Sequence, residues 1–188
     1  MSKAVMLSIR PKWVEKIASG EKTIEVRKTK PKLETPFKCY IYCTLPKYPH
    51  EDFIATDYPR PQFYGGGKVI GEFSCDRIYE LETRSPGGSY YVKGQGQPTT
   101  NDVARHSCLT LKDMHEYLQA GKDYGWHIFD LLIYDQPREL SEFQRATDPC
   151  DSCHAEYTWE CTDCKKLGGD IKRPPQSWCY VEATKDGW

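Results

Sequence analysis

The segment SIRPKWVEKIASGEKTIEVRK, residues 8–28, sets the first fold elements of this chain. Pro11 is expected to open a helix, because a proline at the first helical position gives up an N–H that has no partner there. Apolar residues recur at helical spacing from there to Ser19. Gly20 is the expected C-terminal cap, because glycine accepts a left-handed backbone without steric cost. The chain then returns as a strand at TIEVR, residues 23–27.

Alternation along this strand predicts which side chains face the core. Ile24 and Val26 share one face and are expected to be buried, since alternate residues of a strand lie on the same side. The opposite face and the turn before it gather the polar candidates for a site: Lys22, Thr23, Glu25 and Arg27.

These residue types suit the binding of a charged or polar ligand. Arg27 could hold a phosphate or a carbonyl group with two N–H donors, and Lys22 could act as a charge, a base or a nucleophile. Glu25 could accept hydrogen bonds from a base or move a proton. A structural alternative stays open: Glu25 and Arg27 could form an exposed ion pair, worth about 1 kcal/mol or less.

The rest of the chain predicts short strands and helices in mixed order. Strands are expected at residues 4–9, 38–44, 69–78, 126–134 and 178–182, the fourth of them buried, and a second amphipathic helix at 110–120. Residues 83–100 have the composition of a loop. This order predicts an α+β class, with a small mixed β-barrel and flanking helices in one domain over residues 1–188. A Cys-rich insertion is expected at residues 144–174.

That insertion carries the strongest metal motif. Two Cys-x2-Cys pairs are separated by seven residues, and four thiolates suit tetrahedral zinc. The site would be structural, holding a loop that is too polar to fold alone. An iron–sulfur cluster and free or redox-active thiols are the alternatives. The predicted ligands are Cys150, Cys153, Cys161 and Cys164. Cys39, Cys43 and Cys179 fall in expected strands and are interpreted as small buried residues.

Composition narrows the class of protein. The 188 residues include 26 Lys+Arg and 27 Asp+Glu, and the net charge is −1. Residues 1–32 hold nine basic and only three acidic side chains, a local excess that can attract phosphate. No segment approaches the roughly 20 apolar residues that a membrane span needs. The N-terminal residues lack the apolar stretch of a signal peptide, so we expect a cytoplasmic protein with reduced cysteines.

The residues 8–28 resemble the opening of ASCH domains, whose G-x-K-x-x-E-x-R signature is matched by Gly20, Lys22, Glu25 and Arg27. Three later segments also look like parts of phage and bacterial ASCH proteins: GKVIGEF at 67–73, GWHIFDLLIYDQPRELSEF at 125–143 and RPPQSWCYVE at 173–182. The resemblance implies a PUA-like fold with a cleft beside the signature, in a superfamily that binds RNA or modified bases.

The resemblance also implies possible enzymes. A few small bacterial relatives are N4-acetylcytidine amidohydrolases, and ribonuclease activity has been attributed to others. In the amidohydrolase pattern a Lys works with a Thr three residues later and with a distant Glu. Lys22 matches that Lys, but Glu25 occupies the Thr position, and Thr23 has the wrong strand parity to replace it.

Three function hypotheses follow. The first is a module that binds RNA or a nucleotide, with Arg10, His127 and Trp178 as further ligand-binding candidates and Tyr58, Phe63, Tyr64, Tyr90 and Tyr91 as loop aromatics for stacking. The second is a hydrolase acting on RNA or an N-acylated nucleoside, with Lys22 and Glu25 as catalytic groups and Glu72 as a possible second carboxylate. The third is a protein-interaction module.

Structural alternatives remain: His127 as a core or rim residue, Trp178 as part of the core, and the tyrosines as loop packing.

Overall fold

The computed structural model describes residues 3–55, 63–83, 89–118, 122–146 and 169–184. The chain divides into two compact units, one of residues 1–14, 38–73 and 132–188 and one of residues 15–37 and 74–131. The elements in chain order are β1 (Lys3–Ile9), α1 (Pro11–Ala18), β2 (Ile24–Arg27), β3 (Phe37–Cys43), η1 (Pro49–Glu51), β4 (Ile54–Ala55), β5 (Phe63–Tyr64), β6 (Val69–Cys75), β7 (Ile78–Thr83), β8 (Tyr90–Val92), α2 (Thr100–His106), α3 (Leu111–Leu118), β9 (Lys122–His127), β10 (Phe129–Arg138), η2 (Leu140–Glu142), β11 (Gln144–Arg145), β12 (Gly169–Asp170) and β13 (Trp178–Glu182).

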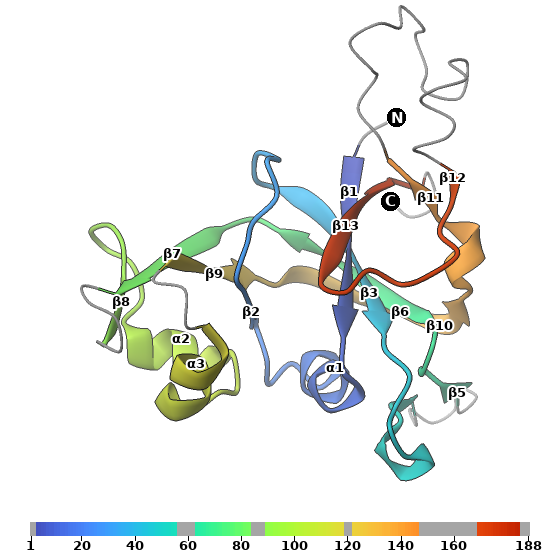
Figure 1. The fold of residues 1–188 in the computed structure, drawn as a ribbon, viewed down its shortest axis with the longest axis horizontal. Coiled ribbons are helices and arrows are strands. Elements are labelled where there is room, and N and C mark those ends of the chain that lie inside the picture. The colour runs from blue at the N-terminus through green and yellow to red at the C-terminus, as the bar shows by residue number, and fades with distance from the viewer. Residues whose placement is uncertain (1–2, 56–62, 84–88, 119–121, 147–168, 185–188) are drawn as a thin grey trace, which may run out of the picture. The chain divides into compact units, whose positions relative to one another are not determined.

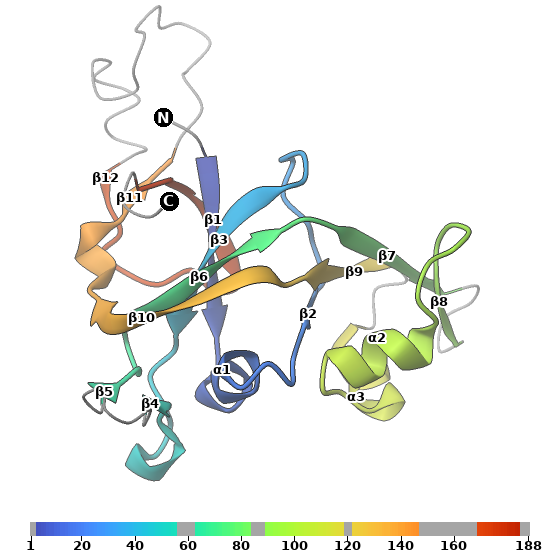
Figure 2. The same cartoon turned by 180° about the vertical axis from the view of Figure 1, so that it is seen from behind.

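The first unit holds most of a seven-stranded sheet with the order β10-β6-β3-β1-β13-β11-β12. Strand β1 lies in its middle, parallel to β3 and antiparallel to β13, as Figure 1 and the reverse view in Figure 2 show. Residues 4–7 of β1 are completely buried, because a central strand covered on both faces needs a continuous apolar run. The core on this sheet is formed by Ala4, Met6, Tyr40, Tyr42, Val69, Phe143, Ile171 and Val181.

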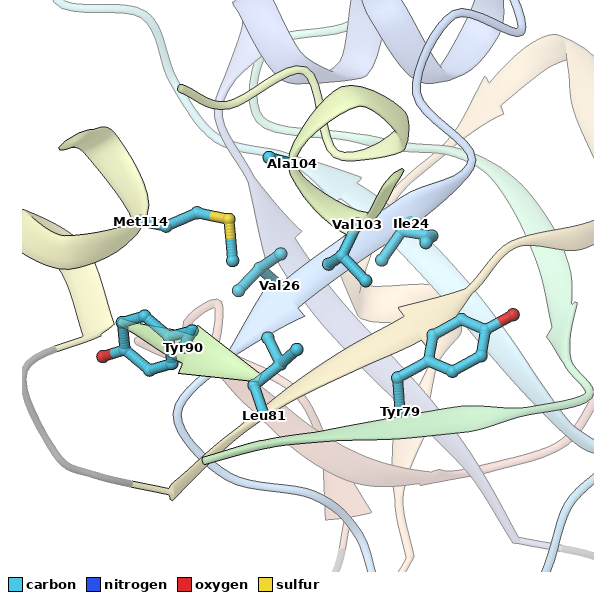
Figure 3. Packing of buried hydrophobic residues seen from close by; sticks show 8 residues of the cluster. All are labelled: Ile24, Val26, Tyr79, Leu81, Tyr90, Val103, Ala104 and Met114. Carbon is cyan, nitrogen blue, oxygen red and sulfur yellow. The ribbon is translucent and has the colours of Figure 1, made fainter. Parts of the chain in front are cut away.

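The second unit holds an antiparallel four-stranded sheet with the order β2-β9-β7-β8. Apolar side chains from three of its strands pack against residues of α2 and α3 (Figure 3). The cluster consists of Ile24, Val26, Tyr79, Leu81, Tyr90, Val103, Ala104 and Met114. One face of this sheet is therefore the core of the unit, and Glu25 and Arg27 lie on the other face of β2.

The predicted α+β class is confirmed, as are the strands at residues 4–9, 38–44 and 178–182 and the helix that begins at Pro11. The second predicted helix is α3, Leu111–Leu118. In the described part of the chain, no helix is both long enough and apolar enough to pass through a membrane.

Two strand predictions were wrong in extent. The segment 69–78 divides into β6, which ends at Cys75, and β7, which begins at Ile78. The apolar run 126–134 was expected to be one buried strand, but it divides at Ile128 between β9 and β10. In both places the chain leaves one sheet for the other. No residue of β10 is buried, and Phe129 has 56% of its surface accessible.

The segment 83–100, predicted to be a loop, contains β8 and leads into α2. Helix α2 begins with a capping box, in which the side chains of Thr99 and Asp102 each accept a hydrogen bond from the other residue's backbone N–H. This T-x-x-D pattern was visible in the sequence, and it would have predicted the helix.

Candidate functional site

The turn between α1 and β2 determines where Lys22 lies. Gly20 has φ +77°, as its predicted capping role requires, and no atom lies within 4 Å of where a Cβ would be. The glycine is therefore needed for its backbone conformation rather than for space. The backbone N–H of Lys22 then donates to the carbonyl of Lys16 at 2.8 Å, which fixes the backbone of the turn just before β2.

Lys22 is buried, with only 3% of its surface exposed. Its ammonium donates to the carbonyl oxygens of Ile24 at 2.9 Å and Ser107 at 2.8 Å, and it lies 3.2 Å from Glu25 Oε2. An ammonium has three N–H donors, and these three acceptors match that number. Ser107 follows the last residue of α2, so Lys22 ties the end of this helix to the start of β2.

Glu25 is held from its other side by Arg27, whose Nη2 lies 3.0 Å from Glu25 Oε1. Burial alone would raise the pKa of Glu25, but the charges and hydrogen bonds of Lys22 and Arg27 outweigh it and lower the pKa below its usual value. The carboxylate is therefore ionised at neutral pH. Lys22, Glu25 and Arg27 form one buried group, which we call the β2 triad.

The alternation predicted for β2 is confirmed. Ile24 and Val26 belong to the core cluster of Figure 3, whereas Glu25 and Arg27 lie on the opposite face. The structural alternative of an exposed Glu25–Arg27 pair is wrong in one respect: the pair exists, but both residues are more than 90% buried. Across the ladder Glu25 faces Trp126, which is fully buried and meets the ring of Phe37 edge-on at 5.8 Å.

Thr23 lies just before β2 and contacts α2. Its Oγ1 is 3.1 Å from His106 Nδ1, and its backbone N–H donates to the His106 carbonyl at 2.9 Å. Thr23 therefore shares the signature segment with the triad, but its side chain is bonded to the helix end.

His127 ends strand β9, directly across from Ile24. Its Nδ1 lies 2.6 Å from Asp76 Oδ1, and about 30% of each side chain is exposed. The rim interpretation of His127 thus describes it better than the core interpretation. Asp76, which lies between β6 and β7, was not singled out in the sequence, because nothing local relates it to a residue 51 positions away.

Comparison with solved structures identifies the fold of this chain. The chain matches the ASCH protein of Zymomonas mobilis with a TM-score of 0.53 over 95% of this chain and 87% of that one, at 17% sequence identity. A point mutant of that protein gives a TM-score of 0.54 at 17% identity, over 96% and 91% of the two chains. This chain has the ASCH-domain fold. No family model matches the sequence, and neither does any curated protein at a significant level.

Two predicted ligand-binding residues of this ASCH fold belong to the other unit. Arg10 is exposed, and its carbonyl accepts the first hydrogen bonds of α1 from Trp13 and Val14. Trp178 is half-buried on β13, where its ring meets that of Tyr180 edge-on at 5.4 Å, so it is not a fully buried core residue.

The predicted stacking aromatics differ in accessibility. Tyr64 is 62% exposed, whereas Tyr90 is buried in the core cluster. Tyr91 is half-buried and donates from its hydroxyl to Glu82 Oε2 at 2.9 Å. Stacking by Tyr90 was therefore a wrong expectation, and Tyr58 lies outside the described residues.

The four predicted zinc ligands, Cys150, Cys153, Cys161 and Cys164, also lie outside the described residues. Within the described ranges, no group of three or more His, Cys, Asp or Glu side chains could hold a metal ion. Cys39 and Cys43 are buried as predicted, but Cys179 is only partly buried. Burial raises the pKa of Cys43, and separately that of Cys75, to about 12, so both remain thiols at neutral pH.

The sequence prediction missed three residues that contact the predicted site residues: Asp76, His106 and Ser107. The last two close helix α2, so recognising its capping box would have drawn attention to them. Asp76 had no such signal.

Proposed function

We propose that this protein binds RNA or a modified nucleotide or base beside the β2 triad. The observation that carries the proposal is the burial of Lys22, Glu25 and Arg27, none of which exposes more than 7% of its surface. Removing three charged groups from water costs free energy that their attraction only partly offsets, and well-packed apolar residues often give equal or greater stability. Such a cluster therefore points to a functional role.

The chemistry of the triad suits a nucleotide. Glu25 is ionised and has lone pairs beyond the two used by Lys22 and Arg27, so it can accept an N–H from a base edge. A guanidinium has five N–H donors, so Arg27 can hold Glu25 and also donate to a phosphate or carbonyl oxygen. Lys22, whose donors go to protein acceptors, has the role of positioning Glu25.

The basic residues that follow β2 support an anionic partner. Lys28, Lys30 and Lys32 are exposed, and Lys28 Nζ lies 5.3 Å from the centre of the half-exposed Tyr117 ring. Exposed lysines attract a phosphate backbone without regard to sequence. The ASCH resemblance adds the expectation that the polymer is RNA.

Hydrolysis of RNA or of an N-acylated nucleoside by Lys22 and Glu25 fits the triad less well. A base or nucleophile needs a lone pair directed at the substrate. Here the Lys22 ammonium donates to two backbone carbonyls, and each oxygen of Glu25 faces a cation.

The test is fluorescence anisotropy with a labelled single-stranded RNA and the variants Arg27→Gln and Arg27→Lys. Loss of a charge-assisted hydrogen bond should weaken binding by roughly 10- to 100-fold in Arg27→Gln, with partial recovery in Arg27→Lys. Glu72→Gln is the matched control, because it perturbs a buried ion pair in the other unit. Thermal unfolding of each variant separates lost binding from lost folding. Unchanged RNA affinity in folded Arg27→Gln would refute the proposal.

We also propose that the Cys-x2-Cys pairs hold one structural zinc ion. The strands that flank the insertion support this proposal, since Arg145 of β11 pairs with Gly169 of β12 and the two ends of the insertion lie side by side. Metal analysis of the purified protein should find one zinc per chain, lost in the double variant Cys150→Ser/Cys153→Ser. A wild-type protein without zinc would contradict it.

A further inference from the structure

The four-stranded sheet carries an aromatic ring beside the β2 triad, on the face opposite to the core cluster of Figure 3. Tyr124 of β9 lies directly across the ladder from Arg27. Residues that oppose each other in an antiparallel ladder point to the same side of the sheet, with Cβ atoms about 5 Å apart. Tyr124 therefore lies next to Arg27 on the face that holds Glu25. Its neighbour Asp123 is buried on the core side, where the Tyr90 hydroxyl donates to it.

The contacts of Tyr124 give the same orientation independently of its pairing with β2. Lys30 Nζ lies 5.2 Å from the centre of the Tyr124 ring and 2.7 Å from Glu80 Oε1. Glu80 lies directly across from Tyr124 on its other neighbouring strand, β7. One lysine thus contacts both side chains, so all three lie on the open face. A cation rather than an apolar side chain lies over the ring, which is typical of a ring that faces solvent.

The two ends of this face of β9 differ in what covers them. Trp126, at one end, is fully buried, and its ring meets that of Phe37 edge-on. Tyr124, toward the other end, is only partly buried, and the lysine over its ring has 41% of its side chain exposed. A ligand bound at Arg27 can therefore extend toward Tyr124 but not toward Trp126.

The charged side chains around Tyr124 favour an anionic strand. In the described part of this face, three lysines and two glutamates lie around the ring, namely Lys30, Lys93, Lys122, Glu80 and Glu82. Lys93 Nζ lies 3.5 Å from a carboxylate oxygen of each glutamate. Exposed ion pairs add little stability, so a phosphate can replace a carboxylate as the partner of a lysine at small cost. The excess of lysines adds to the positive charge of the β2 triad.

We propose that the Tyr124 ring stacks on a base of the bound RNA, beside the nucleotide that Arg27 holds, and that Lys30 moves from the ring to a phosphate of the same strand. This proposal rests on the proposed function. Stacking on an aromatic ring tolerates any sequence, because every base has a π-face. The ligand is therefore a single strand that continues past Arg27, rather than a free nucleoside.

The experiment uses a set of short single-stranded RNAs, each with the fluorescent base 2-aminopurine at one position. Stacking on an aromatic ring quenches this base. In complexes saturated with protein, at least one position should therefore be dimmer with wild type than with Tyr124→Leu, which keeps an apolar side chain of similar length. Tyr124→Leu should also bind roughly 5- to 100-fold more weakly, the value of one stacked base. Tyr124→Phe keeps the ring and should behave as wild type in both measurements.

The matched control is Tyr48→Leu. Tyr48 is an exposed tyrosine of the other unit, and Lys47 Nζ lies 5.1 Å from the centre of its ring. Its substitution should change neither the affinity nor the fluorescence. Lys30 has a readout of its own: Lys30→Gln should lower the slope of log affinity against log salt concentration by about 0.7, the loss of one phosphate contact with a single strand.

The outcomes separate this proposal from the one on which it rests. If folded Tyr124→Leu keeps the wild-type affinity and fluorescence while Arg27→Gln weakens binding, the stacking role is overturned and the proposed function stands. Adenosine monophosphate that displaces the RNA at equal concentration would also overturn it, because a single nucleotide would then satisfy the site. If the wild-type protein binds no RNA, both proposals fail. Circular dichroism of each variant shows whether it is folded.

Discussion

Glu25 and Glu72 are buried to nearly the same degree, with 7% and 6% of their surfaces exposed, but the side chains that hold them differ. Glu25 lies between two cations, Lys22 and Arg27, in the second unit. Glu72, in the first unit, has one cation and a phenol. Lys38 Nζ lies 2.7 Å from its Oε1, and the Tyr134 hydroxyl donates to its Oε2 at 2.6 Å.

The difference separates a structural cluster from a candidate site. Burial and the hydrogen bond to Glu72 raise the pKa of Tyr134, so the phenol stays neutral and the charges of Lys38 and Glu72 cancel. That arrangement satisfies polar groups within a sheet and needs nothing further. In the β2 triad two cations share one carboxylate, which leaves one positive charge uncompensated, and this arrangement favours an anionic ligand.

The largest expected effect comes from removing the carboxylate of the triad. Glu25→Ala leaves Lys22 and Arg27 buried without their shared counter-charge, which should cost about 3–5 kcal/mol of unfolding free energy. Urea denaturation followed by circular dichroism measures the loss. Glu25→Gln keeps the side-chain shape and one acceptor oxygen, so its loss of unfolding free energy should be smaller than that of Glu25→Ala. A loss below about 1 kcal/mol in Glu25→Ala would contradict this prediction, because a loss that small is typical of an exposed ion pair.

Asp123 is a third buried carboxylate, and it shows what burial does to a carboxylate that lacks the two cations of Glu25. Among the described residues, the only hydrogen bond that it accepts comes from the Tyr90 hydroxyl at 3.4 Å. Burial raises its pKa to about 6. The unfolded state loses this proton near pH 4, so the raised pKa makes stability fall as the pH rises from about 4 to about 6. The unfolding free energy of Asp123→Asn, relative to that of wild type, should therefore rise by on the order of 3 kcal/mol as the pH goes from about 4 to about 6.

The lowered pKa of Glu25 has the opposite sign: its contribution is present above the unfolded pKa and is lost as the pH falls through the folded pKa. Denaturation over a range of pH separates the two carboxylates, since Glu25→Gln should flatten the acid side of the profile and Asp123→Asn the region just above it. Identical profiles for wild type and Asp123→Asn would contradict the assignment.

The smallest effect is expected in the charge-balanced cluster. Tyr134→Phe removes one hydrogen bond to Glu72 and should cost about 1 kcal/mol, with RNA affinity unchanged. Thermal unfolding and the anisotropy assay measure both quantities on one preparation. Weaker RNA binding in Tyr134→Phe would contradict the interpretation that the Glu72 cluster is structural and only the β2 triad is a candidate binding site.

The sequence by itself determined the local framework of the β2 site. Gly20 predicted the turn, and strand alternation separated Ile24 and Val26 from Glu25 and Arg27. These predictions succeeded because they depend on backbone conformation and on neighbours a few residues apart. The apolar run of residues 4–9 likewise predicted a strand, which is β1.

Only the tertiary structure decided what surrounds those residues. The burial of the triad, the bond from Lys22 to Ser107 and the contact of Asp76 with His127 join segments 51 or more positions apart. The cluster of Lys38, Glu72 and Tyr134 likewise draws on three strands. Spacing in a sequence determines which face a side chain takes, but burial and partners depend on which strands and helices pair, and that pairing is set by packing over the whole chain.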